Sequence, residues 1–111
     1  MVSAFASAAD YPPAGSQSTE QGRAVWIANC EGCHAYGIAG SPNPMSSSDW
    51  VDRVGKPRSV LYEHAINGFF GPDDTQMPPR GGNDQLRDIE VKEAVDYMLQ
   101  LVNYTLKTQE K

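Results

Sequence analysis

The chain has little of what several protein classes depend on. Its 111 residues contain two cysteines and two histidines, which leaves few ligands for a structural zinc site. Lysine and arginine together number 9 against 14 aspartates and glutamates, and the resulting charge of −5 argues against a nucleic-acid partner. No apolar run approaches the ~18–20 residues that a membrane-spanning helix needs. Strand patterns, internal repeats and a second domain are also not visible, so the sequence favours a small all-α domain.

The length is enough for one small domain, whose modest core often needs an additional staple to be stable. The excess of acidic residues has two interpretations. It either favours a partner with a basic docking surface, or it is a solvated surface that only confers solubility.

Residues 1–17 are expected to form an irregular segment, because they are rich in alanine, serine, proline and glycine. Ala6-Ser7-Ala8 fits the small-x-small end of a secretory signal, although the basic region and most of the hydrophobic region of such a signal are missing. The segment is therefore either a signal-peptide remnant or simply an irregular end. We assign residues 18–111 to one domain.

Four helices are predicted in that domain. Ser18 with Gln21 fits a capping box at the start of the first, and Asp88 is expected to cap the last. Gly68 is a suitable residue to end the third. The expected ranges are 19–31, 48–54, 58–67 and a last helix from Asp88, with an apolar stripe of Val91, Ala94, Val95, Met98 and Val102.

Two loops rich in proline and glycine separate these helices, over residues 35–47 and 69–85. The second is expected to lack regular structure. Long loops inside compact domains are usually functional, so it is a candidate site.

The most informative stretch is Cys30-Glu31-Gly32-Cys33-His34, which uses both cysteines of the chain. Two thiols three positions apart on a helical turn point the same way, so they can add to the two vinyl groups of a haem. His34 is then placed to ligate the haem iron. The pattern therefore indicates covalent attachment of one c-type haem.

Two other interpretations of this motif are weaker. A disulfide redox pair usually lies near a βαβ pattern, whereas the sequence after the motif is helical. A structural zinc site needs four tetrahedral ligands, and only His64 is available besides the motif's own residues. Moreover, His34 directly follows Cys33, which is awkward for a tetrahedral site.

The second axial position has several candidates, and an open position is also conceivable. Met98 belongs to the apolar stripe of the last helix, which favours a role in the core. Met45 follows His34 by few residues, which leaves little chain to reach the other haem face. His64 lies within a predicted helix, where a surface or half-buried histidine is common. Met77 is favoured, since Pro78 and Pro79 stiffen the loop that would present it.

The chain resembles the class I c-type cytochromes, and most closely the cytochrome c5 group. The resemblance covers roughly residues 20–102, and the element around Met77 with the helix after it is more discriminating than the cysteine motif. Some cytochromes c5 carry an additional cysteine pair, which this chain lacks. The matching stretches are Gly22-x-x-x-Trp26, Cys30–His34, Gly40-Ser-Pro42, Trp50-x-x-Arg53, His64–Phe69, Met77–Gly82 and Glu90–Met98.

The resemblance implies a small class I cytochrome c fold, with crossing terminal helices, one or two short helices and long loops wrapped around one haem. Haem c and its iron would be the cofactor. Gly22 and Trp26 would cross Tyr97, consistent with a close helix approach and large apolar faces.

The resemblance also suggests residues that support the haem. The carbonyl of Pro42 would accept a hydrogen bond from His34 Nδ1, as partners of metal-ligating histidines do. Trp50 and Arg53 would lie near a haem propionate, although a core tryptophan and a surface arginine explain these two residues equally well.

The expected function is transfer of single electrons between a donor and an acceptor protein in transient contacts. The exposed haem edge would serve as the contact, with Ile38, Phe70 and Pro78 around it. We expect an exported, periplasmic bacterial monomer that is not an enzyme. A subunit or domain of a larger oxidoreductase is the first alternative. A haem enzyme or gas-binding protein is the second, with His64 as its single free histidine.

Overall fold

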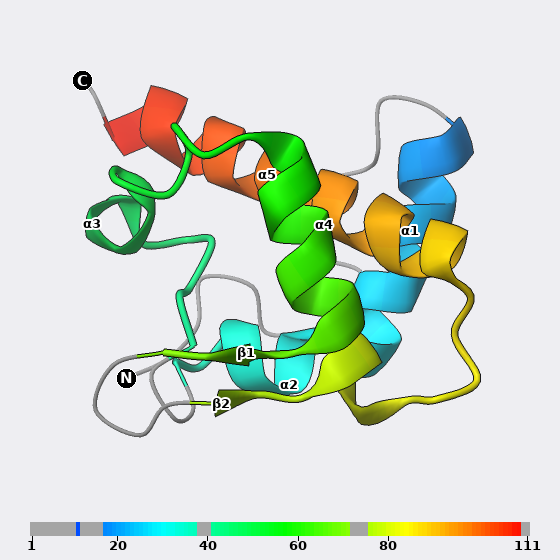
Figure 1. Cartoon of the computed structure of the whole chain (residues 1–111). Helices are drawn as coiled ribbons and strands as arrows, with labels where there is room; N and C mark the ends of the chain where they lie inside the picture. Colours follow the sequence, from blue (N-terminus) through cyan, green and yellow to red (C-terminus); the bar gives the residue numbers. More distant parts are fainter. Residues whose placement is uncertain (1–10, 12–16, 38–40, 72–75, 110–111) are drawn as a thin grey trace.

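The computed structural model describes Tyr11 and residues 17–37, 41–71 and 76–109. The expected all-α class is confirmed, since helices dominate the described residues and the sheet found among them is very small (Figure 1). Within the described part, no helix is long and apolar enough to cross a membrane. The elements are α1 (Gln17–Asn29), α2 (Glu31–His34), α3 (Ser47–Trp50), α4 (Arg58–Asn67), β1 (Phe69–Phe70), β2 (Gln76–Met77), the 3₁₀ helix η3 (Pro79–Gly82) and α5 (Asp88–Gln109).

The first and last long helices, α1 and α5, cross at a point of very close approach. Gly22 of α1 lies against the backbone of Glu93 and Ala94, and a Cβ atom there would overlap the Glu93 carbonyl. One helical turn further along α1, Trp26 packs on Tyr97 with ring centroids 6.1 Å apart. The expected crossing is therefore confirmed. It is possible because Gly22 has no side chain, which lets α1 approach the backbone of α5 at Glu93 and Ala94.

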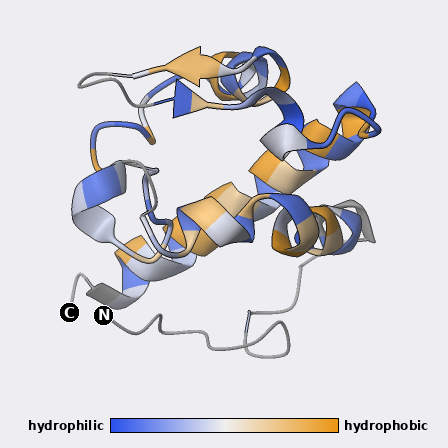
Figure 2. Ribbon diagram, turned by 90° about the horizontal axis from the view of Figure 1, so that it is seen from below, coloured by the Kyte–Doolittle hydropathy of each residue, from blue (hydrophilic) through white to orange (hydrophobic). Residues whose placement is uncertain are grey.

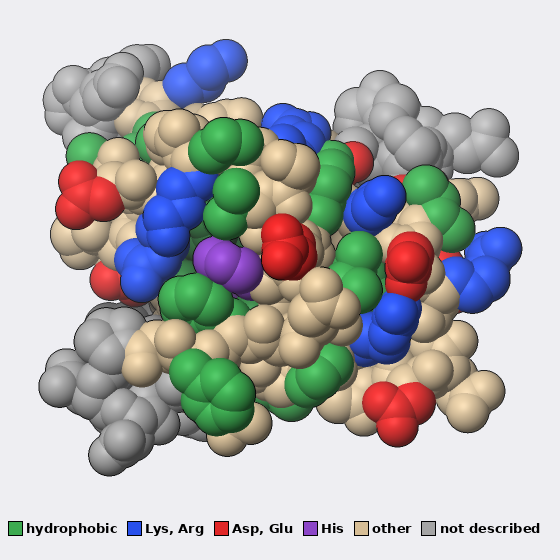
Figure 3. Space-filling view, in the orientation of Figure 1, with side chains coloured by type: hydrophobic (Ala, Val, Ile, Leu, Met, Phe, Trp, Pro, Cys, Tyr) green, Lys and Arg blue, Asp and Glu red, His purple; other side chains and the backbone are tan. Residues whose placement is uncertain are grey.

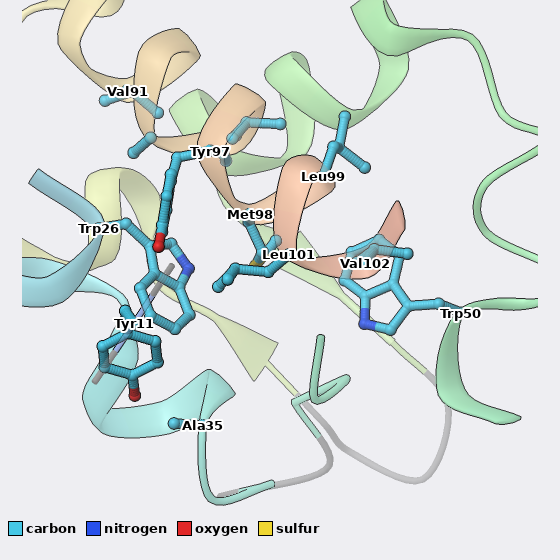
Figure 4. Close-up of a cluster of buried hydrophobic side chains, with 13 residues drawn as sticks. Tyr11, Trp26, Ala35, Trp50, Val91, Tyr97, Met98, Leu99, Leu101 and Val102 are labelled. Carbon is cyan, nitrogen blue, oxygen red and sulfur yellow. The ribbon is translucent and has the colours of Figure 1, made fainter. Parts of the chain in front are cut away.

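A cluster of buried hydrophobic residues spreads from this crossing along α5 (Figure 4). α5 carries both hydrophobic and hydrophilic residues (Figure 2). Most of its hydrophobic residues are buried in the core. α5 contributes most of the cluster: Val91, Ala94, Val95, Tyr97, Met98, Leu99, Leu101 and Val102. The predicted apolar stripe of this helix is thus confirmed.

Tyr11, from the segment expected to be irregular, is also a core residue with 2% of its surface exposed. Its ring meets Trp26 edge to face at 5.3 Å, and its hydroxyl donates to Glu31 Oε2 at 2.9 Å. Arg23 also donates to the Tyr11 carbonyl at 3.1 Å. This part of the N-terminal segment is therefore attached to α1 and to the cysteine motif. Residues 1–10, including Ala6-Ser7-Ala8, lie outside the described residues.

Helix α4 packs on α5 through a polar contact at its edge. Asp96 Oδ1 accepts hydrogen bonds from Tyr62 at 2.5 Å and from Arg58 at 2.9 Å. Burial and the Asp96 contact raise the pKa of Tyr62, which keeps its hydroxyl as the donor. The cation of Lys92 also lies 5.9 Å from the Tyr62 ring centroid, so both helices contribute charged groups to this contact.

Residues 69–71 and 76–85 are more ordered than predicted. Expecting no strand there was wrong, because β1 and β2 pair antiparallel with Phe69 opposite Met77 and Phe70 opposite Gln76. Strands of two residues are too short to show an alternating pattern in the sequence.

The helix predicted over residues 48–54 is shorter than expected, because α3 covers only Ser47–Trp50. The starts of α1 and α5 lie within a few residues of the predictions, but their predicted caps need correction. α1 begins at Gln17, one residue before the predicted cap, and α5 begins at Asp88. Glu90 rather than Asp88 caps α5, because the Arg87 backbone N–H donates to Glu90 Oε1 at 2.8 Å. As predicted, α4 covers residues 58–67 and ends at Gly68.

Replacing Gly22 with alanine tests the helix crossing. Because the new methyl group would meet backbone rather than a movable side chain, we expect Gly22→Ala to lower the free energy of unfolding by about 2–3 kcal/mol. Gly55→Ala is the matched control, since a Cβ at Gly55 meets no atom within 4 Å. Urea unfolding should move the control by no more than about 0.5 kcal/mol. Equal stabilities for the two variants would contradict the crossing.

Replacing Tyr11 with phenylalanine tests its attachment to the motif. We expect Tyr11→Phe to cost about 1–2 kcal/mol at neutral pH, because it leaves Glu31 without its donor. Burial and Glu31 raise the Tyr11 pKa above its ordinary 10.0, so this contribution is complete below about pH 10 and is lost as pH rises through the folded-state pKa.

The stability gap between wild type and Tyr11→Phe should accordingly narrow above about pH 10, as urea unfolding across the alkaline range would measure. Tyr104→Phe, at a site that is 51% exposed, should leave stability unchanged at neutral pH. A gap that stays constant with pH would contradict the role given to the Tyr11 hydroxyl.

Candidate haem site

The cysteine motif forms the turn between α1 and α2. The Cys30 N–H donates to the Trp26 carbonyl at 2.8 Å, and the His34 N–H donates to the Cys30 carbonyl at 3.1 Å, so the helical geometry continues through the turn. Both thiols are free; Cys30 is half-buried and Cys33 is exposed. Burial, with a smaller effect of Cys33, raises the pKa of Cys30 to about 12. Cys30 therefore lies at the core and Cys33 at the surface.

The imidazole of His34 is buried and held in one orientation. Its Nδ1 lies 2.9 Å from the carbonyl oxygen of Pro42, which can only accept, so Nδ1 carries the hydrogen. Nε2 is then the atom with the free lone pair. Burial lowers the pKa of His34, and this exceeds the opposite effect of the Pro42 carbonyl. The ring is therefore neutral at pH 7 and able to bind a metal.

A cavity of about 470 Å³ lies beside His34, between α4, α5 and the loops. On the face shown in Figure 3, a histidine lies among hydrophobic side chains, with cationic side chains on one side of it and an acidic side chain on the other. Arg53, Lys56 and His64 contribute to the lining, as do Leu61 and Phe69. The cavity thus combines apolar walls with positive charge, which suits a flat hydrophobic group that carries carboxylates.

The structure separates the four candidates for a second axial ligand. Met77, Met98 and His64 line the same cavity as His34, whereas Met45 is not part of its lining. Met98 is a buried residue of α5. The His64 ring packs on the Phe69 ring, with 4.2 Å between the ring centroids. Met77 is half-buried in β2, and it also lines a smaller adjoining space with His34 and Cys30.

The backbone around Met77 is restricted from several sides. β2 pairs with β1, and a Cβ at Gly68 would lie 3.1 Å from the Met77 carbonyl oxygen, so only glycine fits there without strain. On the other side of Pro78 and Pro79, Arg80 adopts a left-handed conformation with φ of 56°. Its guanidinium donates to the Leu86 carbonyl at 3.0 Å and to Asp88 Oδ1 at 2.6 Å. The Met77 loop is thereby fastened to the start of α5.

Trp50 and Arg53, expected near a propionate, both line the cavity. Trp50 is buried, yet its indole Nε1 has no hydrogen-bond partner among the described residues. Buried donors normally find an acceptor. Arg53 Nη1 donates to the Asp49 carbonyl, which restrains its cationic group at the cavity lining. An unsatisfied donor beside a cation fits a carboxylate inside the cavity.

Two further residues at the site, Asn43 and Asp49, were not among the predicted ones. The Asn43 backbone N–H donates to Asp49 Oδ2 at 3.1 Å. Asn43 Nδ2 donates to the Ala35 carbonyl at 3.1 Å, and Asn43 Oδ1 accepts from the Met45 N–H at 2.8 Å. The available signal was the position of Asn43 between two prolines, Pro42 and Pro44, which have no N–H of their own.

Comparison with known proteins agrees with this geometry. Residues 17–98 match the family described as cytochrome c oxidase, cbb3-type, subunit III. Cytochrome c-555 from Prosthecochloris aestuarii is 37% identical over 81 residues, covering 70% of this chain and 82% of the relative. Cytochrome c-555 from Chlorobaculum thiosulfatiphilum is 35% identical over 78 residues, covering 70% of this chain and 90% of the relative.

This chain belongs to the class I c-type cytochromes. The family resemblance found in the sequence is thereby confirmed, and the cofactor is covalently bound haem c with its iron. The residues present fit such a group, because Cys30, the neutral His34 and the unsatisfied indole donor of Trp50 line cavity space, and the second free thiol, Cys33, is exposed in the same turn.

Proposed function

We propose that this protein transfers single electrons between redox proteins through one haem, joined to Cys30 and Cys33 and ligated by His34 and Met77. The main support is that His34 and Met77 line a common cavity, with the His34 ring oriented so that Nε2 is available for the iron. The haem iron, when present, takes up and releases one electron. His34 and Met77 would keep both axial positions filled in either oxidation state.

Several features of the chain suit this role. Met77 is an uncharged thioether, which favours the ferrous iron and raises the reduction potential relative to two histidine ligands. Burial around the site also raises the reduction potential, because a buried environment disfavours the additional positive charge of the ferric iron. The hydrogen bond from His34 to Pro42 and the restricted loop around Met77 would keep both ligands in place when the charge on the iron changes.

The surface near the site offers an apolar contact for a redox partner. Phe70 is 79% exposed, and Pro78, next to Met77, is exposed as well. Ile38, the third residue expected at this edge, lies outside the described residues. We propose that donor and acceptor dock transiently at this edge, which suits rapid turnover because such contacts bury little area.

We further propose a periplasmic location and a monomeric state. Cys30 and Cys33 are the substrates of covalent haem attachment, which takes place on the outer side of the bacterial inner membrane. The excess of acidic residues over basic ones favours partners with basic docking surfaces.

A role as a subunit or domain of a larger oxidoreductase is the second candidate, favoured by the description of the matching family. The two functions differ in how the native protein is isolated. Solubilised membranes of the source organism should yield this protein in a stable complex if it is a subunit, and as a separate small protein if it is a mobile carrier.

Absorption spectra of the haem-loaded protein test the proposed ligands. Wild type should show a reduced c-type spectrum and, when oxidised, the weak red-edge band of methionine bound to ferric iron. Met77→Ala should abolish that band and let cyanide bind rapidly, because a coordination position becomes open. Met45→Ala is the matched control, since Met45 does not line the cavity, and it should retain the band. Persistence of the band in Met77→Ala would exclude Met77 as the ligand.

Trp50→Phe tests whether the unsatisfied indole donor serves a propionate. Loss of a hydrogen bond to that carboxylate should raise the propionate pKa and lower the reduction potential at neutral pH, as potentiometry over a range of pH would measure. Trp26→Phe is the control, because Trp26 Nε1 is also without a partner among the described residues but does not line the large cavity. If both variants shift the potential equally, the effect comes from core packing.

A further inference from the structure

The peptide bond between Pro42 and Asn43 connects two different parts of the site. Its carbonyl oxygen lies 2.9 Å from His34 Nδ1, and its N–H donates to Asp49 Oδ2 at 3.1 Å. In a trans peptide these two groups point in opposite directions, so His34 and Asp49 lie on opposite sides of the same planar unit. The result is a continuous chain of hydrogen bonds from a carboxylate, through one peptide, to the imidazole.

Such an arrangement is electrically directional. The negative charge of Asp49 attracts the hydrogen of the Asn43 N–H, which draws electron density in the peptide towards the Pro42 oxygen. That oxygen then becomes a stronger acceptor for the His34 Nδ1–H. A stronger hydrogen bond at Nδ1 makes Nε2 a better electron donor, as a directly bonded carboxylate does for metal-bound histidines.

The surroundings hold this chain of hydrogen bonds in place. His34 is 6% exposed and Asn43 is 9% exposed, so water does not compete strongly at either end of the peptide. The Asn43 side chain bonds to the Ala35 carbonyl and the Met45 N–H, which fixes the peptide plane relative to α2. Asp49 is half-buried and belongs to the short helix α3. The helix therefore fixes the backbone that carries its carboxylate.

We propose that Asp49 is a positioning residue that lowers the reduction potential of the haem by polarising the Pro42–Asn43 peptide against His34. This inference depends on the proposed function, because it takes His34 as the axial ligand. Asp49 opposes the effect of Met77: the thioether favours ferrous iron, whereas the polarised histidine favours ferric iron. The potential is then set by both sides of the haem.

Asp49→Asn is the test, because asparagine can still accept the Asn43 N–H but carries no charge. The variant should raise the reduction potential of the haem-loaded protein. In the reduced protein, the proton resonance of His34 Nδ1–H should move upfield and the proton should exchange faster with solvent, since its hydrogen bond is weaker. Asp49→Glu, which keeps the charge, should restore the potential and the resonance at least partly towards wild type.

Asp52→Asn is the matched control for charge alone. Asp52 is three positions further along the chain, is exposed and lines the cavity, but the Asn43 N–H is bonded to Asp49. Loss of the Asp52 charge should raise the reduction potential only by a long-range electrostatic effect, which salt should weaken. The His34 Nδ1–H resonance should stay in place. The shift in Asp49→Asn should persist at high salt, because a hydrogen-bonded chain is not screened by ions in solution.

The outcomes separate this inference from the proposed function. If wild type lacks a His/Met spectrum, the proposed ligation fails, whatever Asp49 does. If wild type has that spectrum and the Asp49→Asn and Asp52→Asn variants behave alike, with an unmoved Nδ1–H resonance, the peptide relay is overturned and Asp49 acts only as a charge. Should Asp49→Asn fail to fold, Asp49→Ser takes its place, because serine also offers an uncharged acceptor to the Asn43 N–H. A raised potential with an upfield Nδ1–H resonance in that variant would support the relay, and an unmoved resonance would overturn it.

Discussion

The close approach of α1 and α5 at Gly22 is the constraint on which the site depends. Because the Glu93 carbonyl lies where a side chain would be, the two helices cross at one position only. This crossing fixes the position of α1 relative to α5, and hence the position of Cys30 and His34, which follow α1. The same α5 supplies Val95, Met98 and Leu99 to the cavity wall. The attachment motif and the opposite wall are thus positioned by a single contact between backbones.

The two proposed axial ligands are held by different physical means. His34 is fixed by directional hydrogen bonds, first to Pro42 and then through the Asn43 peptide to Asp49. Met77 is fixed by limits on the backbone: strand pairing with Phe69, the adjacent prolines and the contact of its carbonyl with Gly68. A hydrogen bond suits a polar ring that needs one orientation. A thioether offers only a weak acceptor, so its position has to come from the chain that carries it.

Much of this architecture could be predicted from the sequence, because its signals are local. The cysteine motif, Gly22 with Trp26 and the stripe of α5 are periodic or contiguous patterns, and the contact from His34 to Pro42 followed from resemblance to a family. The pairing of β1 with β2 could not be seen, since two residues leave no period. Nor could the bond from Asn43 to Asp49 or the burial of Tyr11, because these contacts join segments whose relative position only the folded chain defines.

Tyr11 limits where the N-terminal segment could be cut under the proposed export. Its ring fills core space beside Trp26, and its hydroxyl bonds to Glu31, which lies between the two cysteines. A leader peptidase that cut after Ala8 would leave this anchor on the mature chain. A cut beyond Tyr11 would remove the ring that packs on Trp26 and the hydroxyl that donates to Glu31. Packing at the cysteine motif therefore depends on a residue that precedes α1 in the sequence.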